Sequence, residues 1–211
     1  MESTGLLPRS EHSTVRAEMR ASQHARLLAA VADQVAEHGY AATSVARIAR
    51  AAGVSTRAFY EHFADKEACL LAAYEVAITT AVERLSAADE PSLPWRDRLE
   101  ALMRAWFALL AAEPSVTHLY ALDIWHATPA TQRRAVEGTA TLVSVFRRCS
   151  QEARTDEPRV LPVTEDELQM LAGGTHRLML LRVLAGETDR LGELVPTVVA
   201  TAISILTRTA R

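Results

Sequence analysis

Residues 52–71, AGVSTRAFYEHFADKEACLL, contain the strongest local signals of the chain. Gly53 can adopt the left-handed backbone that a tight turn requires, and Ser55 is a residue type preferred as a helix N-cap. With Ser55 as N-cap, Val54 and Phe59 have the spacing of a hydrophobic staple, which fixes the angle at which the chain enters a helix. The stretch therefore predicts a short helix that begins directly after a glycine turn.

The residues before this turn predict another short helix. Thr43 and Ser44 can cap it, while Ile48 and Ala49 would lie on its inner face. Two short helices joined by a turn that contains glycine have the helix-turn-helix plan, here over residues 44–62.

The large side chains of this segment divide into two faces. Helical spacing turns Phe59 and Phe63 inward, toward an apolar stripe on the preceding helix formed by Leu27, Val31 and Val35. The side chains left facing outward are polar: Thr56, Arg57, Tyr60 and His62, with Lys66 just beyond them. Residues 43–66 carry four basic and two acidic side chains, in a chain whose net charge is −3. The outward face therefore needs a partner, and the local charge favours an anionic one.

Composition predicts a helical protein with a sizeable core. Hydrophobic residues make up 49% of the 211 residues, enough for one large or two small domains, and glycine and proline number only eight each. The net charge argues against a globally basic nucleic-acid binder, so any DNA contact depends on a local patch.

The cysteines and the apolar runs of the sequence indicate the cellular compartment and the class of partner. Cys69 and Cys149 show neither metal-ligand spacing nor a disulfide framework, which indicates the reducing cytoplasm. No apolar run approaches the ~18 residues of a membrane span, so no membrane partner is expected. Residues 1–16 have no apolar core of signal-peptide length and are interpreted as a flexible tail. The preference for arginine over a single lysine is typical of a GC-rich bacterial genome.

Helix start and stop signals recur along the chain, and no segment has a convincing strand pattern. Gly39 suits the position just after a helix, Pro129 follows a capping Thr128, and Thr164 with Glu167 forms a capping-box pair. The predicted fold is all-α with about nine helices, at roughly 17–38, 44–52, 55–62, 65–87, from 94 onward, 114–125, 128–153, 164–185 and 190–209.

The last predicted helix is apolar around most of its circumference. Such a helix must be covered on both sides, and at a chain end the simplest second cover is another copy of the protein. We therefore expect a homodimer formed through the last two helices; full burial within one subunit is the alternative.

The segment TSVARIARAAGVSTRAFYEHFADKEACLL resembles the amino-terminal domain of the TetR (tetracycline repressor) family of transcriptional regulators. The shared pattern consists of Thr43, Ile48-Ala49, Ala52-Gly53-Val54-Ser55, Phe59-Tyr60, His62-Phe63 and Lys66-Glu67. The detailed resemblance covers about residues 20–75, and beyond it only the number, length and order of the helices agree. It implies a DNA-binding domain over 17–66 and a ligand-binding and dimerisation domain over 67–211, connected by the helix at 67–87.

The resemblance also implies roles for single residues. The third helix would enter the DNA major groove by its amino-terminal end, with Thr56 and Arg57 reading base edges. The remaining DNA-binding candidates would contact backbone phosphates or cap helices: Thr43, Ser44, Ser55, Tyr60, His62 and Lys66. For each, the plainer interpretation is a cap or a solvated side chain.

The middle helices would hold an effector pocket, as they do in this family. The candidates are Met103, Trp106, Phe107, His118, Tyr120, Trp125, Phe146 and Thr175, whose apolar majority suits a small hydrophobic or aromatic effector. Ordinary core packing is the alternative for each of them. His118, Asp123 and His126 do not have a clean metal-ligand spacing, and no metal or other cofactor is expected.

The leading hypothesis is a ligand-responsive repressor that binds a palindromic operator as a homodimer and is released by its effector. A DNA-binding regulator without a small ligand, controlled by a protein partner or acting as a broad DNA organiser, remains an alternative. An enzyme on a helical scaffold is disfavoured, because the sequence has no nucleophile–base pair, glycine-rich phosphate loop or metal cluster.

Overall fold

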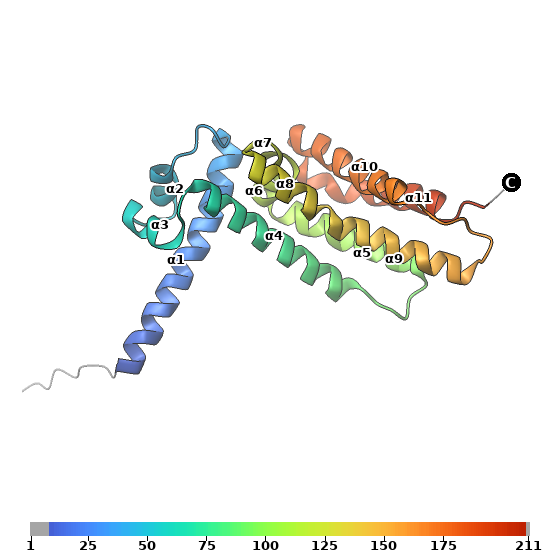
Figure 1. Cartoon of the computed structure of the whole chain (residues 1–211), viewed down its shortest axis with the longest axis horizontal. Helices are drawn as coiled ribbons and strands as arrows, with labels where there is room; N and C mark the ends of the chain where they lie inside the picture. The colour runs from blue at the N-terminus through green and yellow to red at the C-terminus, as the bar shows by residue number, and fades with distance from the viewer. Residues whose placement is uncertain (1–8, 210–211) are drawn as a thin grey trace, which may run out of the picture. The chain divides into compact units, whose positions relative to one another are not determined.

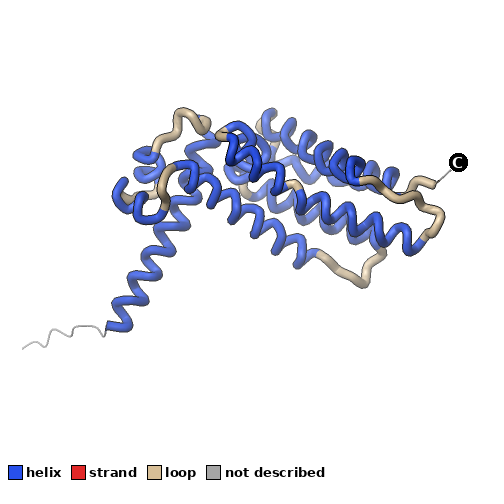
Figure 2. The backbone as a smooth tube through the Cα atoms, in the orientation of Figure 1, coloured by secondary structure: helices blue, strands red, loops and turns tan. Residues whose placement is uncertain are grey.

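The structure, a computed structural model, describes the backbone of residues 9–209 and side chains from residue 17 onward (Figure 1). The described residues form helices and connecting loops, apart from an isolated β-bridge between Val160 and Thr209 (Figure 2). The chain divides into two compact units, an amino-terminal unit that ends at Ala73 and a carboxy-terminal unit from Tyr74. The division falls inside α4, later than the boundary at residue 66 that the sequence suggested.

The amino-terminal unit contains α1 (Arg9–His38), α2 (Val45–Ala51), α3 (Thr56–His62) and the first turns of α4 (Lys66–Ala88). Its core is apolar and fully buried, formed by Leu27, Val31, Val35, Ile48, Phe59, Cys69 and Leu70. The thiol of Cys69 lies 3.7 Å from the carbonyl oxygen of Leu27, which joins the first turns of α4 to α1. This contact explains why the unit extends past residue 66.

Helix α1 begins at Arg9, whereas the sequence predicted a flexible tail up to residue 16. Residues 9–16 follow Pro8 and contain neither glycine nor proline, so nothing in them ends a helix. The rest of the predicted tail, residues 1–8, lies outside the described part of the chain.

The carboxy-terminal unit contains the remainder of α4 and the other helices. These are α5 (Trp95–Ala112), α6 (Pro114–His118), the π-helical segment η1 (Leu119–Asp123), α7 (Ile124–His126), α8 (Pro129–Gly138), α9 (Ala140–Asp156), α10 (Glu165–Leu184), the 3₁₀ segment η2 (Thr188–Leu194) and α11 (Val195–Leu206). When segments that abut one another are joined, residues 9–209 form nine helices, and the predicted all-α fold is confirmed.

Three of the joined helices are less regular than predicted. The helix over 114–126 contains the π-helical segment, and the helix over 128–156 is interrupted at Thr139. The last helix opens with the 3₁₀ turns of η2, and Pro196 lies in the first turn of α11, where its missing N–H is tolerated. Among the described residues, no helix has the length and apolar character needed to cross a bilayer.

Candidate DNA-binding surface and effector site

The helix-turn-helix is held together by two side-chain caps and a backbone turn. Ser44 Oγ accepts a hydrogen bond from the amide of Arg47 at 3.3 Å, and Ser55 Oγ accepts one from the amide of Ala58 at 3.0 Å. Between the caps, Gly53 has φ of +66°, a backbone conformation that residues with a Cβ rarely adopt. The predicted N-cap at Ser55 and the predicted glycine turn are therefore confirmed.

Two of the predicted DNA-reading residues and one predicted phosphate donor face solvent from α3. The side chain of Arg57 is 92% exposed, and Tyr60 is 56% exposed although it is large and aromatic. Thr56, at the first position of the helix, is also exposed. Arg57 Nε lies 3.5 Å from a carboxylate oxygen of Glu61, one turn further along α3. Three side chains with hydrogen-bonding atoms are thus presented from the outer face of one short helix.

Phe59 faces the opposite way and anchors α3. It is fully buried, it meets Tyr60 edge-on with ring centroids 5.5 Å apart, and it lies 5.7 Å from the ring of Phe63. The inward and outward faces that helical spacing predicted for these aromatic residues are confirmed. Phe59 therefore packs α3 against the core, while the exposed side chains lie on the opposite face of the helix.

Lys66 is held by the backbone of its own unit. Its Nζ donates hydrogen bonds to the carbonyl oxygens of Tyr40 at 2.7 Å and Thr43 at 2.9 Å, and it lies 4.0 Å from the centroid of the Tyr40 ring. Two of its three N–H donors are therefore occupied by the loop between α1 and α2. The structure thus gives Lys66 a structural function that the sequence interpretation did not consider.

Thr43 is likewise an internal residue. Its side chain is buried, and its hydroxyl lies within hydrogen-bonding distance of the carbonyl oxygens of Gln34 at 3.0 Å and Gly39 at 2.9 Å. The capping role belongs to Ser44 instead. Of the residues proposed for DNA contact, Ser44 and Ser55 are exposed but serve as caps, while His62 is half-buried beside α1.

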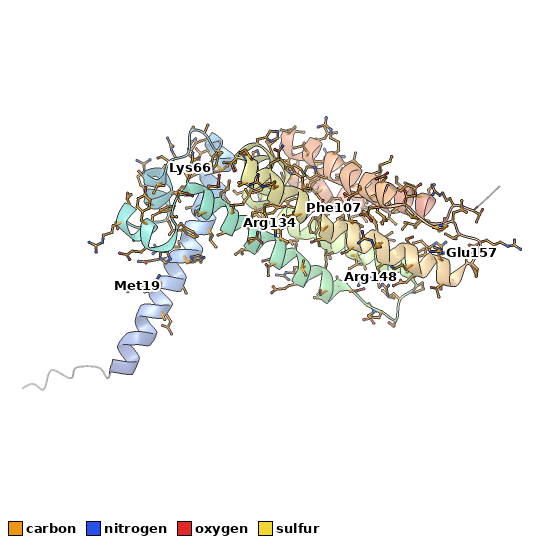
Figure 3. The ribbon with its side chains drawn as sticks, in the orientation of Figure 1. Met19, Lys66, Phe107, Arg134, Arg148 and Glu157 are labelled. Atoms are coloured by element: carbon orange, nitrogen blue, oxygen red, sulfur yellow. The ribbon has the colours of Figure 1, made fainter. Side chains whose placement is uncertain are left out.

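The residues predicted to hold an effector lie in the core of the carboxy-terminal unit. Met103, Trp106, Phe107, Tyr120, Phe146 and Thr175 are all buried, and Figure 3 labels Phe107 among the helices of this unit. Trp106 and His176 each meet the ring of Tyr120 edge-on, at centroid distances of 5.5 Å and 6.0 Å, and Trp125 lies 5.2 Å from His176. The structure thus joins Trp106, Tyr120 and Trp125 in one aromatic cluster.

The side chains of His118 and Asp123 contact each other directly. His118 Nδ1 lies 2.7 Å from Asp123 Oδ2, and the carboxylate is largely buried. Burial raises the pKa of Asp123, although the hydrogen bond from His118 opposes the rise. His126 instead bonds the backbone oxygen of Leu122 at 2.8 Å. In the described part of the chain no group of three or more metal-binding side chains comes together.

Two surface grooves lie beside the carboxy-terminal half of α4. One has a volume of about 350 Å³ and is lined from α4 and α9, on which Figure 3 labels Arg148; the other has a volume of about 480 Å³ and is lined mostly by alanines of α4 and α5. None of the eight predicted effector residues lines either groove.

Comparison with known proteins identifies the amino-terminal unit. Residues 27–73 match the family model described as bacterial regulatory proteins, tetR family. The amino-terminal unit contains a tetR-family domain. The matched range contains the whole helix-turn-helix, and the family resemblance of the sequence motifs is thereby confirmed. TetR-family proteins are DNA-binding transcription regulators, and this chain shares their helix-turn-helix.

One curated relative is similar in sequence over about half of the chain. A fatty acid metabolism regulator protein of Bacillus subtilis (strain 168) is 24% identical over 102 residues, which cover 48% of this chain and 53% of that protein. The chain thus matches about half the length of this curated relative.

Two solved structures superpose over most of the chain. The fatty acid degradation regulator FadR of Bacillus halodurans has a TM-score of 0.75 at 20% identity, covering 84% of this chain and 96% of its own. FadR of Bacillus subtilis, solved in complex with stearoyl-CoA, has a TM-score of 0.75 at 18% identity, covering 85% of this chain and 97% of its own. At these identities the two structures show that this chain shares their fold.

Several residues of the carboxy-terminal unit were missed by the sequence analysis. Tyr74 stacks on Tyr120 at a centroid distance of 6.1 Å, and a Cβ added to Gly138 would lie 2.0 Å from the Tyr74 hydroxyl. His176 lies in the aromatic cluster, and its buried Nε2 has no hydrogen-bond partner among the described residues. Burial lowers the pKa of His176. A histidine beside Thr175 in an apolar helix was the one available signal.

Proposed function

We propose that this chain is a ligand-responsive transcriptional repressor that binds a palindromic operator as a homodimer. The observation that carries the proposal is the outer face of α3, where Thr56, Arg57 and Tyr60 are exposed on a helix anchored by Phe59. Thr56 and Arg57, in its first turn, would read base edges, and Tyr60 would donate to a backbone phosphate. A bidentate arginine–guanine contact supplies about 1–3 kcal/mol of discrimination.

Dimerisation through α10 and α11 would place two reading helices on one duplex. Its support is the exposed face of α10, which combines the large apolar side chains of Met170, Leu181 and Leu184 with two exposed glycines, Gly173 and Gly174. A Cβ added to either glycine would meet nothing within 4 Å, so both leave space outside the helix for a close neighbour. Two half-sites read in successive major grooves would be about 34 Å apart.

The effector would be a hydrophobic molecule that binds in the carboxy-terminal unit. Support comes from the apolar and aromatic side chains gathered there and from the stearoyl-CoA in the Bacillus subtilis relative. A long-chain acyl thioester is therefore the first effector class to test. Because Met103 and Phe107 are fully buried, an effector that reaches them must displace part of the core.

Release from DNA would follow from reciprocal coupling between effector and operator. If the effector favours a conformation in which α4 tilts, the two reading helices no longer match the duplex. A hundredfold loss of DNA affinity requires about 2.7 kcal/mol of coupling, and operator DNA must weaken effector binding by the same factor.

Selection of bound duplexes from a random DNA library tests the DNA-binding part. We expect a palindromic site, and Arg57→Ala should relax preference at one base pair in each half-site, whereas Tyr60→Phe should weaken binding to all duplexes alike. Equal loss on specific and random DNA for Arg57→Ala would contradict the base-reading role. Calorimetry with stearoyl-CoA tests the effector: binding that leaves operator affinity unchanged would refute the proposed release.

One observation favours the alternative of a DNA-binding regulator without a small ligand. Six of the eight predicted effector residues are buried, and the two grooves beside α4 are lined by other residues. If no acyl thioester or aromatic compound changes operator binding, control by a protein partner becomes the better account.

A further inference from the structure

Four nitrogen-bearing side chains gather where α1 passes the end of α3. The imidazole rings of His24 and His62 are 5.6 Å apart between centroids, and His62 Nε2 lies 3.4 Å from Gln23 Oε1. Arg20 Nη2 approaches the backbone oxygen of Glu61 at 3.5 Å. Arg20, Gln23 and His24 lie within little more than one turn of α1, and they join His62, an expected phosphate contact, to groups that the sequence analysis did not connect with it.

The cluster contains three basic groups and no acidic side chain that pairs with them. Among residues 17–209, no carboxylate lies within ion-pair distance of Arg20, His24 or His62, and the carboxylate of Glu61 is turned to Arg57. The pKa of His62 is lowered by its burial and by the nearby His24 and Arg20, against a smaller opposing effect of Glu61. An anion bound between the three groups would relieve this crowding of positive charge.

The position of the cluster indicates which anion would bind between its basic groups. His62 ends α3, the helix whose first turn carries Thr56 and Arg57, and Tyr60 precedes it by two residues on the exposed side. When a helix enters the major groove by its amino-terminal end, groups near its other end and on a flanking helix are placed to meet the phosphate backbone. Figure 1 shows the amino-terminal turns of α1 extending past α2 and α3 within this unit.

We propose that Arg20, His24 and His62 form a binding site for a backbone phosphate of duplex DNA, and that this contact strengthens when His62 is protonated. The proposal rests on the DNA-binding function proposed above. An imidazolium has donors on both ring nitrogens, and a guanidinium can grip a phosphate with two parallel donors. Because a bound phosphate favours the protonated His62 imidazole, DNA binding takes up protons, and affinity rises as pH falls through the pKa range of His62.

Fluorescence anisotropy with the full-length protein tests the proposal. The probes are a duplex recovered by selection and a mixed-sequence duplex of the same length, titrated between pH 6 and 8 and at several salt concentrations. The variants are Arg20→Gln, His62→Gln and His24→Phe, the last of which keeps an aromatic ring against Phe63, whose ring lies 4.9 Å from that of His24. Arg154→Gln and His126→Gln are matched controls, since both residues are exposed in the carboxy-terminal unit.

We expect the unsubstituted protein to bind about tenfold more tightly at pH 6 than at pH 8. His24→Phe combined with His62→Gln should reduce this dependence to less than about twofold. Arg20→Gln should lower the slope of log affinity against log salt by about 0.9 per subunit, the value of one phosphate contact, on both duplexes alike. The control variants should retain the original slope and pH dependence.

Two results would overturn the proposal, and they can be told apart. If the protein binds its selected duplex but the cluster variants behave like the controls, the phosphate site is wrong while DNA binding stands. If the unsubstituted protein binds neither duplex at any pH, the proposed function itself fails.

Discussion

Replacing Lys66 with methionine should destabilise the amino-terminal unit rather than remove a DNA contact alone. Lys66 Nζ donates to the carbonyl oxygens of Tyr40 and Thr43, and both acceptors belong to the loop that joins α1 to α2. Methionine keeps most of the apolar stem but has no donor. The two carbonyl groups would then depend on water, and the loop that precedes the cap of α2 would lose its attachment to α4.

The size of the effect follows from the contacts. A hydrogen bond to a charged group contributes about 1.5–3 kcal/mol when buried, and each bond here is reduced to about 1 kcal/mol because the ammonium is only partly buried. The ammonium over the Tyr40 ring adds roughly 0.5–1 kcal/mol. The sum is about 2–3 kcal/mol, and for a unit of this size each kcal/mol lowers the melting temperature by about 4–8 °C.

Thermal unfolding followed by circular dichroism measures this loss, and anisotropy with the selected duplex, well below the melting point, measures DNA affinity. Arg50→Met is the matched control, because Arg50 is exposed in the same unit and has no side-chain partner among the described residues. We expect Lys66→Met to lower the melting temperature by at least about 8 °C, and Arg50→Met to leave it nearly unchanged. An unchanged melting temperature together with a large loss of DNA affinity would show that Lys66 is a phosphate donor and refute the structural role.

Three further predictions concern both units. Gly138→Ala should lower the free energy of unfolding in urea by about 1–3 kcal/mol, because its Cβ would lie 2.0 Å from the Tyr74 hydroxyl. Adding Tyr74→Phe to the same chain should recover part of that loss, and additive losses would contradict the clash. Burial raises the pKa of Cys69 to about 12 and that of Cys149 to about 11, so a chromogenic thiol reagent near pH 8 should react with both only after unfolding, and rapid native labelling would refute their burial. The hydrogen bond from Arg134 lowers the pKa of Glu75, so the Glu75 carboxylate stabilises the fold above its ordinary pKa and loses that effect as pH falls through the lowered value. The free energy of unfolding, measured against pH, should therefore fall less steeply in acid for Glu75→Gln; an identical fall in both proteins would contradict the linkage.

Local signals predicted the amino-terminal unit well because its elements are short and each is bounded by its own residues. Ser44 and Ser55 are N-caps, and Gly39 and Gly53 have positive φ; in the carboxy-terminal unit, the capping box at Thr164 likewise closes as expected. Each of these features depends on residues within four positions of one another. Sequence patterns detect such signals directly, since the interacting groups are neighbours in the chain.

The features that the sequence did not predict depend on contacts between residues far apart in the chain. Lys66 reaches a carbonyl 26 positions earlier, and His62 reaches Gln23 across 39 positions. The π-helical segment at Leu119–Asp123 and the contact of Gly138 with Tyr74 likewise depend on packing in the carboxy-terminal unit. Periodicity places such residues on a face of a helix, but it does not say which backbone atom a long side chain will meet. The core residues were therefore predictable as a group, and their individual partners were not.

Helix α4 shows how the two units can influence one another without any assumption about their orientation. It runs unbroken from Lys66 to Ala88, so it passes from one unit to the other at Ala73–Tyr74. Cys69 approaches the Leu27 carbonyl, while Tyr74, little more than one turn later, stacks on Tyr120. The two residues are five positions apart, so they are separated by only about 7.5 Å along the helix axis. If the proposed effector displaced Tyr120, it would therefore act on Tyr74 first, and the core beneath α3 would receive the change through a few residues of α4.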